Sequence, residues 1–267
     1  MASKAKTYID HLSGIGEISF TAMQLQKEMG VTNKAARRIL ERLRSNKEIA
    51  TPAKGYYLIL TPEFRELGCL PPNYFIDDLM SHWHKKYYVG LLSAAMFHGA
   101  AHQQPQGFQV LLPLTRPRII CGKVTIAFVQ NSSCVKTPIQ RMKTPSGTIC
   151  VSTPEATAMD LVKFIRQSGG ISRVATVLHE LAENIDAEKL VELTHLFTES
   201  AWIQRLGYLL DKLGYSELAQ VLCEYVGSIK TRMIPLVPYL PTVNAQKNKK
   251  WRIAVNTTVE SDLDDIY

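Results

Sequence analysis

The chain has 267 residues, of which 46% are hydrophobic, so it can bury the core of one large domain or of two ordinary ones. Its net charge is +7 and its isoelectric point is near 9.1, which favours polyanionic partners. No apolar run reaches the roughly 18 to 20 residues of a membrane span, and the N-terminal residues lack the apolar stretch of a signal peptide. We therefore expect a cytoplasmic protein of at least two domains that makes no membrane contact.

The first sixty residues have the hydrophobic spacing of three helices followed by two short strands. Gly14 and Gly30 end the first two helices, and Thr32 is a good N-cap for the third. This order, with a tight PAKG loop between the strands, is that of a winged helix-turn-helix domain, which we place at residues 1–61. The expected elements are helices over 4–13, from Ser19 or Thr21 to Gly30, and from Thr32, then strands EIAT and YYLIL.

A second, larger domain is expected at residues 73–267, after a connector that holds two prolines. Its pattern begins with helices over 77–101, continues with short strand candidates, and then gives helix after helix over 153–226. Residues 151–227 are acidic, with 6 Lys and Arg against 11 Asp and Glu. A basic loop, NAQKNKK, a strand, WRIAVN, and an acidic tail follow. The predicted class is α+β: an N-terminal winged helix-turn-helix domain and a larger mixed α/β C-terminal domain rich in helices.

The third helix, TNKAARRILERLR, has an apolar seam and a strongly basic outer face. At 100° per residue, one side of the helical wheel carries Ala36, Ile39, Leu40 and Leu43. The opposite side carries Lys34, Arg37, Arg38 and Glu41, with Arg42 and Arg44 on the flanks.

In a helix-turn-helix domain, the N-terminal residues of this helix meet base edges in the major groove. Asn can make a bidentate contact to adenine and Arg to guanine, whereas Lys34 or Arg42 can hold phosphates. A solvated basic face is the alternative, and Glu41 can pair with its basic neighbours and weaken the face. A helix-turn-helix that makes only protein contacts also stays open. The predicted DNA contacts are Thr32, Asn33, Lys34, Arg37, Arg38, Arg42 and, at the tip of the loop, Lys54.

Other patterns give weaker signals for chemistry. His98 and His102 share a helix face at a spacing that can hold a metal, but no third ligand follows at a fixed spacing and no Glu lies between them as in HExxH. The five cysteines lie far apart without a CxxC pair, which argues against a zinc knuckle and a disulfide framework. We predict no metal site, no cofactor and no catalytic residue.

The segment STPEATAMDL holds two carboxylates, Glu155 and Asp160, but the start of a helix explains most of it. Ser152 or Thr153 can cap the helix, Pro154 fits its first turn, and Glu155 can close a capping box with Ser152. Asp160 has no such local explanation.

Four segments after the third helix are distinctive when they are read in order: GYYLILTPEFRELGCLPPNYFIDDLM, YYVGLLSAAMFHGAAHQQPQGFQV, STPEATAMDLV and KKWRIAVNTTVESDL. Together with the N-terminal pattern, they resemble the AbiEi-type antitoxins of abortive-infection, type IV toxin-antitoxin systems. The resemblance runs over nearly the whole chain, and YYVGLLSAAMFHGAAHQ is more specific than the winged helix, which is common.

The resemblance implies an antitoxin that counteracts a nucleotidyltransferase-like toxin encoded alongside it, without a stable complex, in phage defence. It also implies that the N-terminal domain binds inverted repeats in double-stranded DNA at the promoter of its own operon and represses that operon. For the antitoxin activity it points to a domain and not to residues. Two alternatives stay open: a winged-helix transcription regulator with a ligand-sensing C-terminal domain and no toxin partner, and an enzyme that acts through the region of His98 and His102.

Overall fold

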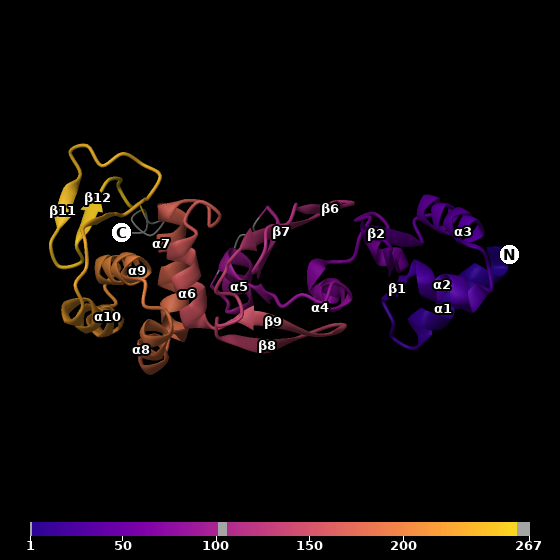
Figure 1. The fold of residues 1–267 in the computed structure, drawn as a ribbon, viewed down its shortest axis with the longest axis horizontal. Helices are drawn as coiled ribbons and strands as arrows, with labels where there is room; N and C mark the ends of the chain where they lie inside the picture. The colour runs from indigo at the N-terminus through magenta and orange to yellow at the C-terminus, as the bar shows by residue number, and fades with distance from the viewer. Residues whose placement is uncertain (1, 101–105, 261–267) are drawn as a thin grey trace. The chain divides into compact units, whose positions relative to one another are not determined.

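A computed structural model of the chain describes residues 2–100 and 106–260 (Figure 1). The chain divides into two compact units, and both contain helices and strands. Unit 1 comprises Met1–Tyr87, Gln106–Cys134 and Arg141–Cys150; unit 2 comprises Tyr88–Pro105, Val135–Gln140 and Val151–Tyr267. The α+β class predicted from the sequence is confirmed.

The three helices expected in the first sixty residues are present in unit 1, and their ends follow from local chemistry. The Thr21 side chain accepts a hydrogen bond from the backbone N–H of Gln24, and the Gln24 side-chain oxygen accepts one from the backbone N–H of Thr21. This capping box starts the second helix. Gly30 ends that helix in the left-handed conformation, with φ at 58°. The helices are α1 (Ala2–Gly14), α2 (Ala22–Met29) and α3 (Asn33–Ser45).

A three-stranded antiparallel sheet completes this N-terminal segment, in the order β1-β3-β2. The predicted strands are β2 (Ile49–Ala53) and β3 (Tyr56–Ile59), while β1 (Ser19–Thr21) was not expected. The sheet and the three helices bury one apolar core, in which the Phe20 ring stacks on Tyr57 with ring centres 5.5 Å apart. The buried core residues are Ala5, Ile9, Phe20, Leu25, Ile39, Leu40, Leu43, Ile49 and Ile59.

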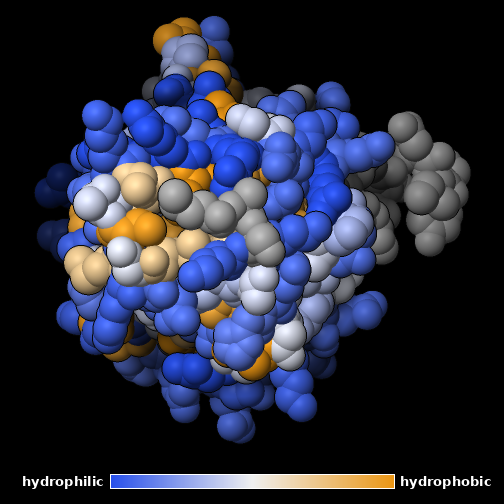
Figure 2. Space-filling model, turned by 90° about the vertical axis from the view of Figure 1, so that its right-hand side faces the viewer, coloured by the Kyte–Doolittle hydropathy of each residue, from blue (hydrophilic) through white to orange (hydrophobic). Residues whose placement is uncertain are grey.

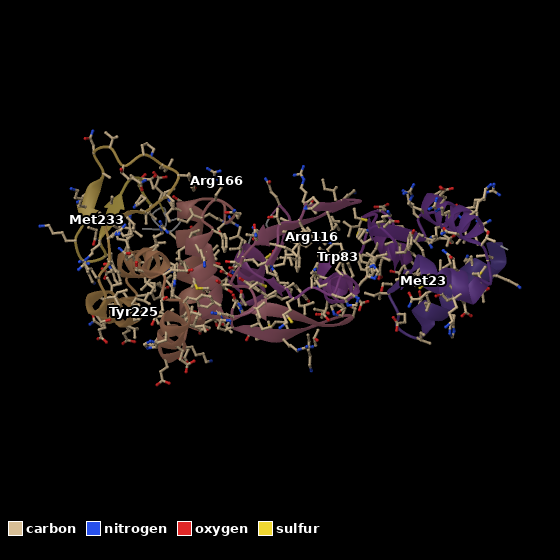
Figure 3. All side chains as sticks on the ribbon, viewed as in Figure 1. Met23, Trp83, Arg116, Arg166, Tyr225 and Met233 are labelled. Carbon is tan, nitrogen blue, oxygen red and sulfur yellow. The ribbon has the colours of Figure 1, made fainter. Side chains whose placement is uncertain are left out.

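The rest of unit 1 is mostly β-structure. Strand β7 pairs in parallel with β5 and antiparallel with β6. Arg116, which precedes β6, lies over the Trp83 ring at 3.4 Å from its centre (Figure 3). The elements are η1 (Pro62–Phe64), α4 (Pro72–His82), β5 (Phe108–Leu112), β6 (Ile119–Cys121), β7 (Val124–Gln130), β8 (Ile139–Thr144) and β9 (Gly147–Ser152). The first two residues of β8 and the last two of β9 belong to unit 2.

Unit 2 is built around α6 (Pro154–Lys163), whose residues from Glu155 to Val162 are all buried. This helix contacts four others, α5, α7, α8 and α9. Helices were expected over 77–101, and α4 and α5 lie in this range. The expectation is wrong between them, because Tyr88 and Val89 form a strand, β4, in which Val89 lies opposite Val151. The remaining elements are α5 (Leu91–Phe97), α7 (Ile171–Leu181), η2 (Ala182–Asn184), α8 (Ala187–Leu196), α9 (Ser200–Lys212) and α10 (Ser216–Ser228).

A small sheet with the order β10-β12-β11 packs on α9. The Gln204 side chain donates to the backbone oxygens of Arg232, Trp251 and Arg252 at 2.9–3.1 Å, and the Trp251 ring is fully buried. The loop predicted for NAQKNKK is therefore wrong, because its centre pairs with the next strand of this sheet. The strands are β10 (Ile234–Pro235), β11 (Gln246–Asn248) and β12 (Ile253–Val255).

None of the helices in residues 2–100 and 106–260 combines the length and apolar character that a membrane crossing needs. The acidic tail beyond residue 260 lies outside the described residues.

The packing of Trp251 on α9 can be tested at Gly207, because a Cβ atom there would lie 2.1 Å from the Trp251 ring. An Ala in the middle of a helix normally stabilises it by about 0.5 to 1 kcal/mol relative to Gly. At this position the clash outweighs that gain, and we expect Gly207→Ala to lower the free energy of unfolding by about 1 to 3 kcal/mol in urea denaturation.

The matched control is Gly227→Ala in α10, where an added Cβ meets no atom within 4 Å. This variant should gain stability or stay unchanged. Equal stability of the two variants would contradict the packing of Trp251 on α9.

Candidate nucleic-acid interface

Helix α3 separates its apolar and basic residues as the sequence predicts. Its buried residues are Ala36, Ile39, Leu40 and Leu43, and the last three belong to the core described above. The side chains on the other side are exposed: Lys34, Arg37, Arg38, Glu41, Arg42 and Arg44. Because a helix cannot turn its seam away from the core without exposing four apolar side chains, the basic face is held toward solvent.

The first turn of α3 is open to an anion. Thr32 caps the helix, and its Oγ1 accepts a hydrogen bond from the Ala35 N–H at 3.4 Å. Asn33 and Lys34 follow, both exposed, and the first turn holds no acidic residue. The free N–H groups of a first turn and the helix dipole favour a negative charge at this point.

The turn between β2 and β3 presents Lys54, whose side chain is exposed. Gly55 follows with φ at 78°, a conformation that glycine adopts without strain. The Gly55 carbonyl accepts from the Ala22 N–H at 3.3 Å, so the turn is tied to the start of α2. Lys54 therefore projects from an anchored turn.

Glu41 lies exposed on the basic face of α3. Among the residues that the structure describes, Glu41 forms no ion pair. It lines a hollow of about 180 Å³ between α3 and the strands, together with Arg37, Arg44, Thr51 and Tyr57. Figure 2 shows the end of the molecule that bears α1, α2 and α3, and hydrophilic residues cover most of it.

His98 is engaged inside unit 2. Its Nε2 lies 2.8 Å from the Ser152 carbonyl oxygen, which can only accept, so Nε2 carries the proton. Its Nδ1 lies 3.3 Å from the Gln140 amide nitrogen and accepts from it. Burial lowers the pKa of His98, which favours this neutral form. Neither ring nitrogen is free for a metal in this arrangement.

His102, which the sequence places at metal-ligand spacing from His98, lies outside the described residues. Within 2–100 and 106–260, no three His, Cys, Asp or Glu side chains are placed to hold a metal ion. All five cysteines fall in this part of the chain, where none forms a disulfide, and Cys69, Cys121 and Cys134 are buried.

The helix start at STPEATAMDL differs in one respect from the expectation. Thr153 is the N-cap and accepts from the Ala156 N–H at 3.3 Å, with Pro154 in the first turn. Glu155 does not close a capping box with Ser152. Its buried carboxylate instead accepts from the Asp186 N–H at 3.0 Å and so ties α6 to the start of α8.

Asp160, which local sequence could not explain, is fully buried and accepts a hydrogen bond from the Tyr88 hydroxyl at 2.7 Å. Its second oxygen has no hydrogen-bond partner among the described residues. Burial raises the pKa of Asp160 to about 7, and the Tyr88 hydrogen bond and the Lys163 charge both oppose this rise. Tyr88 and Asp160 join β4 to α6 across 72 positions of sequence, which is why no local pattern predicted the contact.

This carboxyl makes stability depend on pH. Because Asp160 has a pKa of about 7 in the folded chain and about 3.8 in the unfolded one, the folded state holds its proton more tightly. The contribution of Asp160 is fully present below about pH 4 and is lost as the pH rises to about 7, with an upper limit on the order of 4 kcal/mol.

We expect Asp160→Asn, whose amide oxygen still accepts from Tyr88, to lose less stability than the wild type between pH 4 and 7 in thermal unfolding. Tyr88→Phe should raise the pKa of Asp160 further and move the loss to higher pH. Identical pH profiles of the wild type and Asp160→Asn would show that Asp160 is not the group responsible.

Comparison with known proteins adds three findings. The chain is similar to the crystal structure of the RV2827C protein from Mycobacterium tuberculosis, with a TM-score of 0.69 over 93% of this chain and 90% of that one. The identity is 16%, so this similarity concerns the fold alone. None of the curated protein sequences matches the chain significantly.

The family model of the AbiEi antitoxin C-terminal domain matches residues 88–212, which begin at Tyr88 and end with the last residue of α9. This span contains the Tyr88–Asp160 contact and the whole of α6. The resemblance to the AbiEi-type antitoxins is thereby confirmed over residues 88–212 of the chain.

Proposed function

We propose that this antitoxin belongs to a type IV toxin-antitoxin system, in which it counteracts a nucleotidyltransferase-like toxin and represses its own operon. The proposal divides the chain into a winged helix-turn-helix domain at residues 1–61 and an antitoxin domain at 73–267. The observation that carries the DNA-binding half is the exposed basic face of α3, together with the open first turn of that helix and the exposed Lys54 in the turn between β2 and β3.

In this proposal α3 enters the major groove of double-stranded DNA at inverted repeats of the promoter. Asn33, Arg37 and Arg38 read base edges, because amide and guanidinium groups match adenine and guanine in bidentate geometry. The phosphate contacts are assigned to Thr32, Lys34, Arg42 and Lys54. The helix order α2-α3 around the Gly30 turn and the β2-β3 hairpin support the winged helix-turn-helix assignment.

The antitoxin half rests on the AbiEi domain at residues 88–212, whose family implies a toxin partner. We propose that neutralisation proceeds in the cytoplasm without a stable antitoxin-toxin complex, and that the system acts in phage defence. The protein is proposed to act without a catalytic residue, metal or cofactor of its own.

Removing the base-reading side chains tests the first half. We expect Arg37→Ala and Arg38→Ala each to weaken binding to promoter DNA by about 1 to 3 kcal/mol and to relax sequence preference. Lys143→Ala on β8 is the matched control, because it removes an exposed cation of unit 1 that has no assigned role. Fluorescence anisotropy with the promoter DNA gives the affinities. Equal affinities of Arg37→Ala, Arg38→Ala and Lys143→Ala would contradict the base-reading role of α3.

Lys54 is expected to behave differently, since a phosphate contact carries no sequence information. Lys54→Ala should weaken binding to promoter and scrambled DNA by the same factor. It should also lower the slope of log affinity against log salt by about 0.9. A loss confined to promoter DNA would assign Lys54 to base reading instead.

The two activities should be separable by point variants of the full chain. Truncation is a poorer test, because residues 73–87 belong to the same compact unit as the N-terminal segment. In cells that express the toxin gene adjacent to the antitoxin gene, the Arg37→Ala/Arg38→Ala protein should restore growth while a promoter reporter stays derepressed. Loss of both activities in a folded double variant would contradict the proposed division.

A further inference from the structure

A cavity of about 380 Å³ lies within unit 1, on the side of α3 where that helix ends. Three segments far apart in the sequence form it. They are the end of α3 with the start of β2, the turn that follows η1, and the turn between β6 and β7. The volume lies within the range of about 300 to 1,000 Å³ that is usual for small-molecule sites.

The walls of the cavity are held by backbone contacts. The Lys123 N–H donates to the Leu67 carbonyl oxygen at 2.8 Å. Gly122 lies so close to the turn after η1 that a Cβ atom there would be 2.2 Å from the same oxygen and 2.8 Å from the Gly68 Cα. The cavity is therefore built into the fold of unit 1 and does not depend on the arrangement of long side chains.

The charges that line the cavity are unbalanced. Four cationic side chains, Arg44, Lys47, Arg65 and Lys123, face one carboxylate, Glu66. In the described part of the chain none of these four cations takes part in an ion pair. Like charges gathered in a concave site raise the local potential and attract an anion. Arginine also binds phosphate in a bidentate manner that a point charge cannot provide.

The cavity continues toward the proposed base-reading face. Arg44 and Thr51 line both this cavity and the smaller hollow that contains Arg37. A ligand in the cavity would thus share Arg44 with the side of α3 that is proposed to contact DNA.

We propose that this cavity is a phosphate-binding site that accepts a ligand with at least two phosphate groups. Two sources have this chemistry: a free pyrophosphate or nucleotide, and consecutive backbone phosphates of the bound DNA. Only the second source rests on the proposed DNA-binding function. None of the four cations is among the predicted DNA contacts. Arg65 and Lys123 lie farthest from α3 in the sequence, so changing them leaves that helix intact.

The test uses the full chain and the double variant Arg65→Ala/Lys123→Ala, with Lys143→Ala as the matched control. Both variants change exposed side chains, and circular dichroism checks that they fold. Inorganic pyrophosphate and ATP are titrated by calorimetry, and DNA binding is followed by anisotropy at several salt concentrations. If the ligand is free, the double variant binds pyrophosphate or ATP more weakly by about tenfold or more.

If the phosphates belong to DNA, the double variant instead lowers the salt slope of DNA binding by about 1.8, and pyrophosphate does not bind the wild type. In either case Glu66→Gln should strengthen the interaction that the double variant weakens, because it removes the carboxylate from the cavity. An Arg65→Lys/Lys123→Arg variant should retain binding, since both charges remain.

The proposal is overturned if the double variant matches Lys143→Ala in every titration, or if the wild type binds neither pyrophosphate, ATP nor DNA. Failure of the DNA-binding proposal is distinguishable: DNA would then not bind, while pyrophosphate or ATP would still bind in a manner that depends on Arg65 and Lys123.

Discussion

Burial of the apolar side of α3 determines the arrangement of the N-terminal helices and strands. Ile39, Leu40 and Leu43 lie in the same core as Phe20 and Leu25, so helix, sheet and turn are fixed together. Each fully buried aliphatic side chain contributes about 1.5 to 3 kcal/mol relative to exposure, which far exceeds what surface charges contribute. The orientation of the basic face therefore follows from apolar packing, and repulsion between its own charges cannot turn it inward.

In unit 2 the corresponding constraint is the burial of α6. This helix contacts four others and has an aspartate at its centre, which the protein accommodates with a tyrosine hydroxyl and a raised pKa. A buried carboxyl with one unpaired oxygen is costly unless it stays protonated. The family match spans this contact and the hydrogen bond between Glu155 and Asp186, so the matched part of this chain holds polar contacts within a largely apolar helix packing.

The sequence predicted those helices whose ends and faces are determined by neighbouring residues. Thr32 and Gly30 set helix ends through hydrogen bonds and backbone conformation within four residues, and the seam of α3 needed only helical periodicity. The strands β1 and β4 were not predicted. Two or three residues are too few to show the alternation of a strand, and the conformation of these residues is set by a distant partner strand. Strand β8 was also not predicted, for another reason. It has no buried residue, so its sequence lacks the alternation of apolar and polar residues that indicates a strand.

The predicted contacts of α3 are exposed on one helix, as the wheel requires, but sequence could not give the features that depend on long-range contacts. The cavity beside α3 needs Lys123 to reach Leu67, 56 positions earlier, and Asp160 needs Tyr88. The composition showed that the chain is basic, but it did not show that four of the cationic side chains line one cavity. No residue pattern in the chain predicts a partner. The similarity of residues 88–212 to the AbiEi antitoxin domain is what implies a toxin partner.

The most direct test of the central claim is fluorescence anisotropy of the purified wild-type chain on DNA from upstream of its own coding region. Scrambled DNA of the same length and composition serves as the comparison, at several salt concentrations. If α3 reads the promoter, the chain binds the upstream DNA with clear preference, and its affinity falls steeply as salt is added. Equal, weak binding to both DNAs would contradict this expectation, and would mean that the basic face of α3 is a solvated surface.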